Sequence, residues 1–186
     1  MKKFSMLFVA IVMMAGFSMK VMADGTNTSK TVTGTHAGAV LIVPMGLTQT
    51  AALHFGTIVL TSTAGGTVVL ASNSTSRAFD GGVATAAGNV TSHPSNAAYN
   101  VTGTMNETYA LTLPATITVT ETTGTAAAMV ISALKARFNG ALTDAVSSTL
   151  SSAGTDNFTV GGTLTIPATP VAGIYDGQFD VSVDYN

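Results

Sequence analysis

Residues 109–120 of the chain have the sequence YALTLPATITVT, and this stretch indicates the fold class more clearly than any other. Two leucines alternate with threonine until Pro114 closes the first run, and Ile117 and Val119 are framed by threonine in the second. Successive side chains of a β-strand point to opposite faces, so each run predicts a strand with one buried face and one hydroxyl-covered face.

The rest of the chain repeats this pattern of short β-forming runs separated by Gly, Asn, Ser and Pro. Threonine makes up about one in five of residues 24–186, and its branched β-carbon suits a pleated sheet better than a helix. Runs at intervals of roughly ten residues are typical of an all-β sandwich or barrel. The expected strands are 39–43, 52–60, 67–71, 97–102, 109–113, 116–120, 129–134, 157–160, 162–166 and 174–185.

One stretch, residues 126–142, competes as a helix because it is rich in Ala, Leu and Met. Val130-Ile131 favours a strand, however, and Asn139-Gly140 favours a turn after it. We therefore expect a strand followed by a turn.

The first 23 residues have the composition of a bacterial signal peptide. A positive start is followed by an apolar run, and Val21 and Ala23 fit the −3 and −1 positions of a cleavage site. An uncleaved membrane anchor is the alternative, but the run is shorter than the ~20 residues needed to cross a bilayer and is broken by Lys20. We expect export through the inner membrane, transit of the periplasm and a final place on the cell surface or outside the cell.

Residues 24–186 divide into two parts by composition. Residues 24–38 are polar and have no apolar period, which predicts a flexible N-terminal arm unless a partner orders it. Residues 39–186 are expected to form a single β-sandwich domain, since a chain of this length can bury one sizeable core.

Charge and cysteine content exclude several classes of function. Residues 24–186 carry four basic residues against nine acidic ones, a formal charge of −5, so a basic nucleic-acid surface is not expected. The chain has no cysteine, which excludes disulfides, thiol catalysis and zinc-thiolate sites.

The titratable residues do not form a recognisable catalytic or metal-binding motif. His36, His54 and His93 each stand alone, and His54 is placed by alternation on the polar side of its strand. Glu107 and Glu121 are the only glutamates, and they lie near strand ends where acids are ordinarily solvated. We expect a protein that is not an enzyme and that has no metal or cofactor.

Asp176, Asp180 and Asp184 recur every four residues and suggest a calcium site as one interpretation. In an extended strand they share a solvated face, while Phe179 and Tyr185 belong to the opposite apolar face. Calcium ligation needs convergent loops that supply six or more oxygens, so a solvated acidic face is favoured.

The last fourteen residues resemble the C-terminal motif of bacterial pilins assembled by the chaperone and usher route. Gly173 is fourteenth from the end, Phe179, Val181 and Val183 alternate, and Tyr185 is the penultimate residue. The resemblance implies an incomplete immunoglobulin-like domain whose missing strand is supplied first by a periplasmic chaperone and then by the arm of the next subunit. It places these five residues at the subunit or chaperone contact.

Most of the chain also resembles a bacterial family of domains of unknown function, number 4402. The resemblance implies an exported β-sandwich that forms part of a surface fibre, and it brings no catalytic residues. The stretches that carry it are 53–58, 66–70, 99–103, 109–114, 158–164 and 172–186.

Together these features predict an immunoglobulin-like β-sandwich, either complete in itself or completed by a donated strand, that serves as the structural subunit of a fimbria or pilus. Its expected partners are copies of itself, a periplasmic chaperone and an outer-membrane usher. The alternative is a self-contained secreted sandwich that binds a carbohydrate or a surface protein, with an enzyme third. The candidate inserting residues of the donor strand are either Val32 and Gly34 or the alternating Ala37, Ala39, Leu41 and Val43.

The leader leads to a first testable prediction. Exported protein should begin at Asp24, because Val21 and Ala23 fit the pockets of signal peptidase. Intact mass or N-terminal sequencing of the exported material measures this directly, and a start upstream of Lys20 would contradict the leader.

Overall fold

The computed structural model describes residues 31–86, 92–124 and 126–186, and residues 40–186 form one folded unit. The predicted leader, residues 1–23, and the beginning of the predicted arm, residues 24–30, lie outside the described residues. Every regular element in the described ranges is a strand, and none of these residues belongs to a helix that could span a membrane. The predicted all-β sandwich is confirmed.

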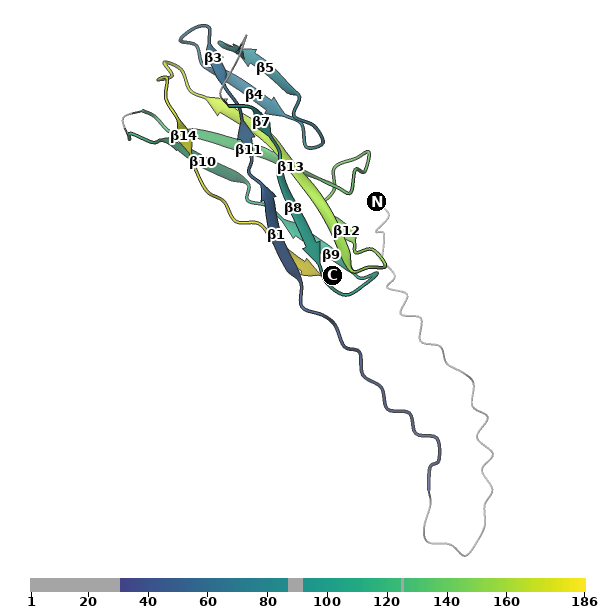
Figure 1. Ribbon diagram of the computed structural model, residues 1–186. Coiled ribbons are helices and arrows are strands. Elements are labelled where there is room, and N and C mark those ends of the chain that lie inside the picture. Colours follow the sequence, from purple (N-terminus) through teal and green to yellow (C-terminus); the bar gives the residue numbers. More distant parts are fainter. Residues whose placement is uncertain (1–30, 87–91, 125) are drawn as a thin grey trace, which may run out of the picture. The chain divides into compact units, whose positions relative to one another are not determined.

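A large antiparallel sheet forms the first layer (Figure 1). Its strands follow the order β1, β8, β13, β11, β10 and β14, and β4 joins the end of β13 and carries β5 on its outer side. Their bounds are β1 Gly46–Ala51, β4 Gly66–Leu70, β5 Arg77–Gly81, β8 Ala97–Thr102, β10 Thr116–Glu121, β11 Met129–Phe138, β13 Thr155–Ile166 and β14 Tyr175–Asp176.

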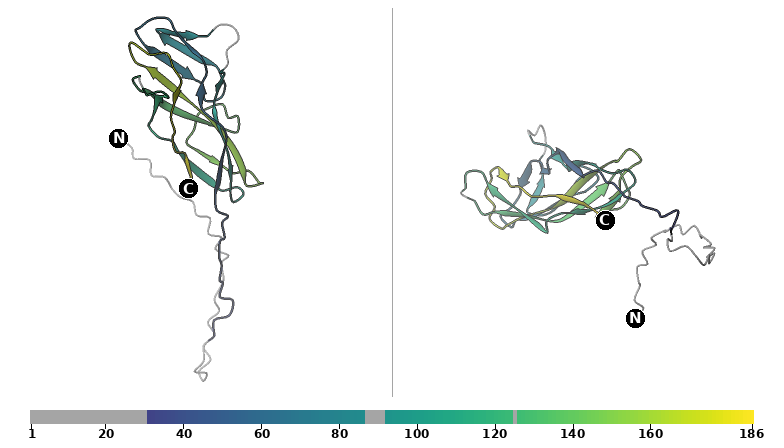
Figure 2. Two further views of the ribbon diagram at one scale, coloured as in Figure 1. Left: turned by 60° about the vertical axis from the view of Figure 1, so that its left-hand side comes forward. Right: turned by 90° about the horizontal axis from the view of Figure 1, so that it is seen from below.

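The second layer is a three-stranded sheet in the order β12 (Ser147–Thr149), β9 (Thr108–Thr112) and β15 (Ser182–Tyr185). The chain changes layers between β9 and β10, through the Leu113-Pro114 link that ends the first alternating run. Seen from below, the two layers face each other (Figure 2), and the buried apolar residues lie between them.

The chain between β1 and β8 forms an insertion of nested strand pairs, in which the innermost pair is β4 and β5. β2 (His54–Phe55) pairs with β7 (Pro94–Ser95), and β3 (Ile58–Leu60) pairs with β6 (Val83–Thr85). The Arg77 guanidinium connects them, because its Nη1 donates to the Phe55 carbonyl at 2.6 Å and to the Thr57 carbonyl at 3.0 Å. The Arg77 Cζ atom also lies 5.0 Å from the centroid of the Phe79 ring. Because Arg77 belongs to β5, its side chain connects the short strands to β5.

Two apolar clusters fill the sandwich. The first, which we call the upper cluster, includes Val68, Leu70, Ile117 and Leu164 and packs the insertion against β10, β11 and β13. Val68 is fully buried in it. The second, which we call the lower cluster, contains Tyr99, Phe138 and Phe158. The rings of Tyr99 and Phe158 are stacked with their centroids 5.0 Å apart, and the centroids of Phe138 and Phe158 are 5.3 Å apart. These ring contacts add to the area that the aromatic side chains bury.

The alternation predicted from the sequence is observed in β10. Ile117 and Val119 are buried, while the threonines on either side of each are exposed. The stretch 126–142 contains β11 and then a turn in which Asn139 and Gly140 have positive φ, so the preference for strand over helix is confirmed.

Five of the expected strands are merged, absent or divided in the structure. The expected strands 157–160 and 162–166 form one continuous strand, β13. Residues 39–43 form no strand, since nothing in the described chain pairs with them. The expected strand 52–60 is divided into β2 and β3 at Gly56, whose φ of +68° breaks the extended backbone. The expected strand 174–185 is divided into β14 and β15, with residues 177–181 in neither.

Two neighbouring valines on β4 provide a matched test of the layer arrangement. Val68→Ala should lower the free energy of unfolding by about 2–3 kcal/mol, because it removes two buried methyl groups and leaves a cavity. Val69→Ala should cost less than about 1 kcal/mol, because Val69 is 43 % exposed on the other face. Urea unfolding of both variants measures the difference, and equal losses would contradict the assigned faces.

Candidate functional site

The C-terminal segment, residues 175–185, is paired on one side only. Within the described ranges β14 pairs with β10 alone and β15 pairs with β9 alone. We call its other side the open edge. β1 is also an edge strand, since β8 is its single partner in the described chain.

The open edge borders the lower core cluster with a row of half-buried apolar side chains. Phe179, Val181, Val183 and Tyr185 pack against this cluster but are not fully covered, while the residues between them are exposed. The alternation predicted for this segment is therefore confirmed.

The same cluster is bordered by β1 from the other layer. Met45 and Leu47 are also half-buried and pack against it. The lower cluster is therefore incompletely covered on the side of the sandwich that carries β1 and the C-terminal segment. Figure 1 shows β1 and the C-terminal end on the same side of the domain.

An exposed apolar run precedes β1 within the folded unit. Val40 is 90 % exposed, Leu41 is 85 % exposed, and Ile42 and Val43 are each 58 % exposed. Four consecutive large apolar residues in water are unfavourable unless a partner covers them, and contiguous exposed apolar surface commonly marks an interaction site.

The candidate donor residues are all exposed and belong to no strand. Residues 31–39, taken by themselves, have no strand structure, and Val32 is 75 % exposed. The six candidates are Val32, Gly34, Ala37, Ala39, Leu41 and Val43.

Gly173 does not lie with the other predicted contact residues. It contacts the buried Glu121 of β10, and a Cβ at position 173 would lie 2.8 Å from Glu121 Cγ. The Glu121 carboxylate accepts hydrogen bonds from the Thr123 backbone N–H at 3.1 Å and from the Thr123 hydroxyl. The glycine therefore leaves room for a buried, hydrogen-bonded carboxylate, which is a packing reason for its presence.

The acidic residues of the C-terminal segment have the predicted orientation. Asp176, Asp180 and Asp184 are exposed. No cluster of three or more potential metal ligands occurs in the described ranges. His54 is exposed as well, and its Nδ1 accepts the Gly56 N–H at 2.8 Å, which closes a local turn.

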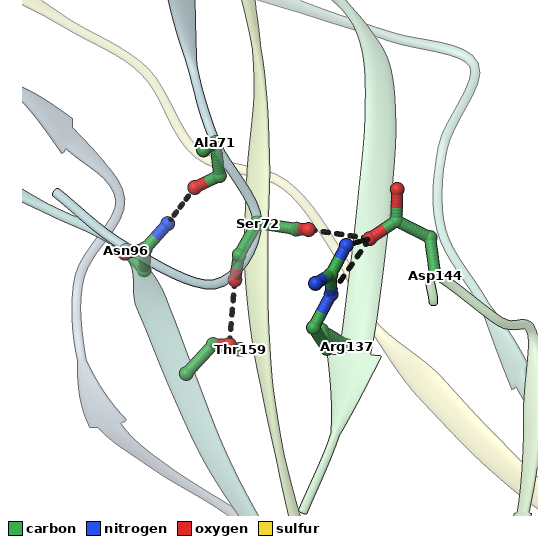
Figure 3. A network of polar contacts seen from close by, with 6 residues as sticks. All are labelled: Ala71, Ser72, Asn96, Arg137, Asp144 and Thr159. Atoms are coloured by element: carbon green, nitrogen blue, oxygen red, sulfur yellow. Dashed lines mark hydrogen bonds and ion pairs between the residues drawn. The ribbon is translucent and has the colours of Figure 1, made fainter. Parts of the chain in front are cut away.

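A polar network joins the turn after β4 to the loop after β11 (Figure 3). The Ser72 hydroxyl donates to Asp144 Oδ1 at 2.5 Å, and Arg137 donates to the same oxygen from Nη2 at 3.0 Å and from Nε at 3.2 Å. Thr159 of β13 donates its hydroxyl to the Ser72 carbonyl at 2.6 Å. The bond from Ser72, followed by those from Arg137, lowers the pKa of Asp144.

A shallow pocket of about 420 Å³ lies between the β9–β10 link and β11. Its walls include Leu113, Leu134 and Val146, and none of its lining residues is titratable. Ala133 in its wall has a φ of +49°, at the bulge where the β11 register shifts. Apart from Thr112, the residues that line the pocket are apolar.

The sequence alone did not identify Thr104, Met45 and Leu47 as residues of this site. Thr104 contacts Tyr185, which is 81 residues away, and no local pattern signals such a contact. Leu47 lies in β1, where GLTQTA lacks a second large apolar residue to show the alternation.

The comparisons with known proteins identify one family. A family model with the description "Domain of unknown function (DUF4402)" matches residues 45–185. No curated protein and no solved structure matches the chain. The matched range begins directly before β1 and ends with β15, so residues 31–44 lie outside it.

The network of Figure 3 leads to a prediction about acid stability. A carboxyl group whose pKa is lowered by folding contributes stability above its unfolded pKa of about 3.9, and this contribution is lost as the pH falls through the folded pKa. Ser72→Ala should therefore lower the free energy of unfolding by about 1 kcal/mol at pH 7, and the difference from the unmodified protein should shrink between about pH 5 and pH 2.

Ser74→Ala is the control, because the Ser74 hydroxyl accepts only a weak bond from the Ser76 N–H in the same turn. Its effect on urea unfolding should not vary with pH. A Ser72→Ala effect of equal size at all pH values would contradict the role of Asp144.

Proposed function

We propose that this chain, which belongs to the family described as DUF4402, is the structural subunit of a bacterial surface fimbria or pilus. Subunits polymerise without covalent bonds when the arm of one copy adds as a strand to the open edge of the next. The product is an extended fibre outside the cell, and no step requires catalysis or a cofactor.

One observation carries this proposal: the chain has both an exposed apolar run and an unpaired apolar edge. Val40 and Leu41 have no cover of their own, and the open edge beside Val181 and Val183 has no strand partner in the described chain. The exposed run can pair with the open edge of a second copy, and the open edge can receive the exposed run of another. Addition of a strand to an exposed sheet edge is a recurrent mode of recognition.

The order of the strands supports an immunoglobulin-like domain that lacks its last strand. A constant-type immunoglobulin domain has one sheet in the order A-B-E-D and a second in the order C-F-G. The order β1-β8-β13-β11 corresponds to A-B-E-D, and β9-β15 corresponds to C-F. The open edge of β15 is then the place that strand G would occupy.

The energies involved are sufficient for a stable contact. Each valine or leucine that passes from water into an apolar site contributes about 1.5–3 kcal/mol. Successive side chains of a strand point to opposite faces, so two of the four residues 40–43 can enter the same site. Their burial, together with a row of paired backbone groups, offsets the cost of ordering the arm and gives a slowly dissociating contact.

An unpaired strand edge is a hazard before assembly, because it pairs readily with any other exposed strand. We propose that a periplasmic chaperone covers the open edge during transit and that an outer-membrane usher receives the subunit. The leader expected at residues 1–23 and the resemblance of the C-terminal segment to chaperone-bound pilins support these partners.

A matched pair of leucines tests the proposed polymerisation. Leu41 and Leu142 are 85 % and 92 % exposed, so replacement of either by Asp should change the free energy of unfolding by less than about 0.5 kcal/mol. Leu41→Asp should abolish fibres, because a charge would be buried against the neighbouring subunit. Leu142→Asp should leave fibres normal.

Electron microscopy of cells that make each variant with its native partners measures the outcome. Co-expression adds a second readout, since a Leu41→Asp chain keeps its open edge and should shorten the fibres of the unmodified protein. Normal fibres from Leu41→Asp would contradict strand donation by this run. A full-length monomer that never polymerises with its partners would favour the secreted binding module instead.

A further inference from the structure

Val43 has both of its backbone polar groups bound to its own domain. Its N–H donates to the Thr104 hydroxyl at 2.7 Å, and its carbonyl accepts the Tyr185 hydroxyl at 2.6 Å. The Thr104 N–H donates to the same tyrosine hydroxyl at 2.7 Å, so that Thr104 and Tyr185 hold each other as well as Val43.

The tyrosine ring is positioned by the surrounding structure. Tyr185 pairs with Tyr109 in the β9–β15 ladder, and the next residue, Asn186, donates its N–H to the Thr108 carbonyl at 3.1 Å. Gly103 leaves the space that the phenol occupies, because a Cβ there would lie 2.4 Å from the Tyr185 hydroxyl. The hydroxyl is therefore held at the end of the open edge.

These contacts divide the chain sharply at Val43. Pro44 follows and has no N–H, while β1 begins at Gly46. On the other side, Val40, Leu41 and Ile42 are exposed and form no strand. Backbone groups that are occupied by Thr104 and Tyr185 are not free to pair with the edge of another subunit.

We propose that Tyr185 and Thr104 form an exit clamp, which fixes the root of the arm at Val43 and ends the donated strand at Ile42. This inference rests on the proposed function, and the partner is a second copy of this chain. Val43, one of the candidate inserting residues, then stays with its own domain, and no free residue separates the donated strand from the clamp. Consecutive subunits are held at a fixed angle, and the fibre is stiff.

Hydrogen exchange on the full-length monomer tests the clamp without fibres. In the unmodified protein the Val43 amide should exchange at least tenfold more slowly than the Leu41 amide. Thr104→Val keeps the shape of the side chain but removes the acceptor, and it should make the two rates equal. Tyr185→Phe should also accelerate exchange at Val43, whereas Tyr175→Phe, which removes a hydroxyl bonded to the Val171 carbonyl, should not. Equal rates at Val43 and Leu41 in the unmodified protein would overturn the clamp.

Fibres of the same variants test its consequence. Thr104→Val should still polymerise, because the donated stretch and the apolar residues of the open edge are unchanged, but the persistence length of the fibres in electron micrographs should fall at least twofold. Tyr175→Phe fibres should be as stiff as those of the unmodified protein. Thr104→Val fibres with undiminished stiffness would overturn the rigid connection. Failure of the unmodified protein to form fibres would overturn the proposed function, while hydrogen exchange would still decide whether the clamp exists.

Discussion

The structure depends on the pairing of β13 with three other strands. Along one side it pairs with β11, and along the other it pairs first with β8 and then with β4. The change of partner occurs at Gly161-Gly162, where a Cβ on Gly161 would lie 2.4 Å from the Leu70 carbonyl oxygen, so glycine permits the end of β4 to approach. One continuous strand thereby connects the upper and lower core clusters, through Leu164 in the first and Phe158 in the second.

The sequence was sufficient to predict the strands that carry their own alternation. β8, β9 and β10 appear within one residue of their expected bounds, since each has apolar residues at every second position. β5 has no such pattern, and pairing with β4 holds it in place. The run 39–43 shows the opposite case, because high β-propensity does not make a strand where no partner strand is present.

The candidate site could be predicted in part for the same reason. The half-buried face of the C-terminal segment follows from alternation within a few residues, so Val181 and Val183 could be named from the sequence. The bond from Thr104 to Tyr185 and the bond from Ser72 to Asp144 join residues that are 81 and 72 positions apart. Such contacts are set by how the layers stack, and a single sequence holds no local signal for them.

The position of β1 determines how the domain carries tension. A pull on the arm acts first on the hydrogen bonds of Val43 and then on Gly46, the first residue of an antiparallel ladder that runs from the Gly46–Thr102 pair to the Ala51–Ala98 pair. A force directed along β1 shears this ladder, and all of its hydrogen bonds share the load at once. Peeling β1 away from β8 would break the bonds one after another at much lower force. An edge strand that continues directly from an exposed arm is therefore a mechanically resistant point of attachment for a subunit that is held by its neighbour.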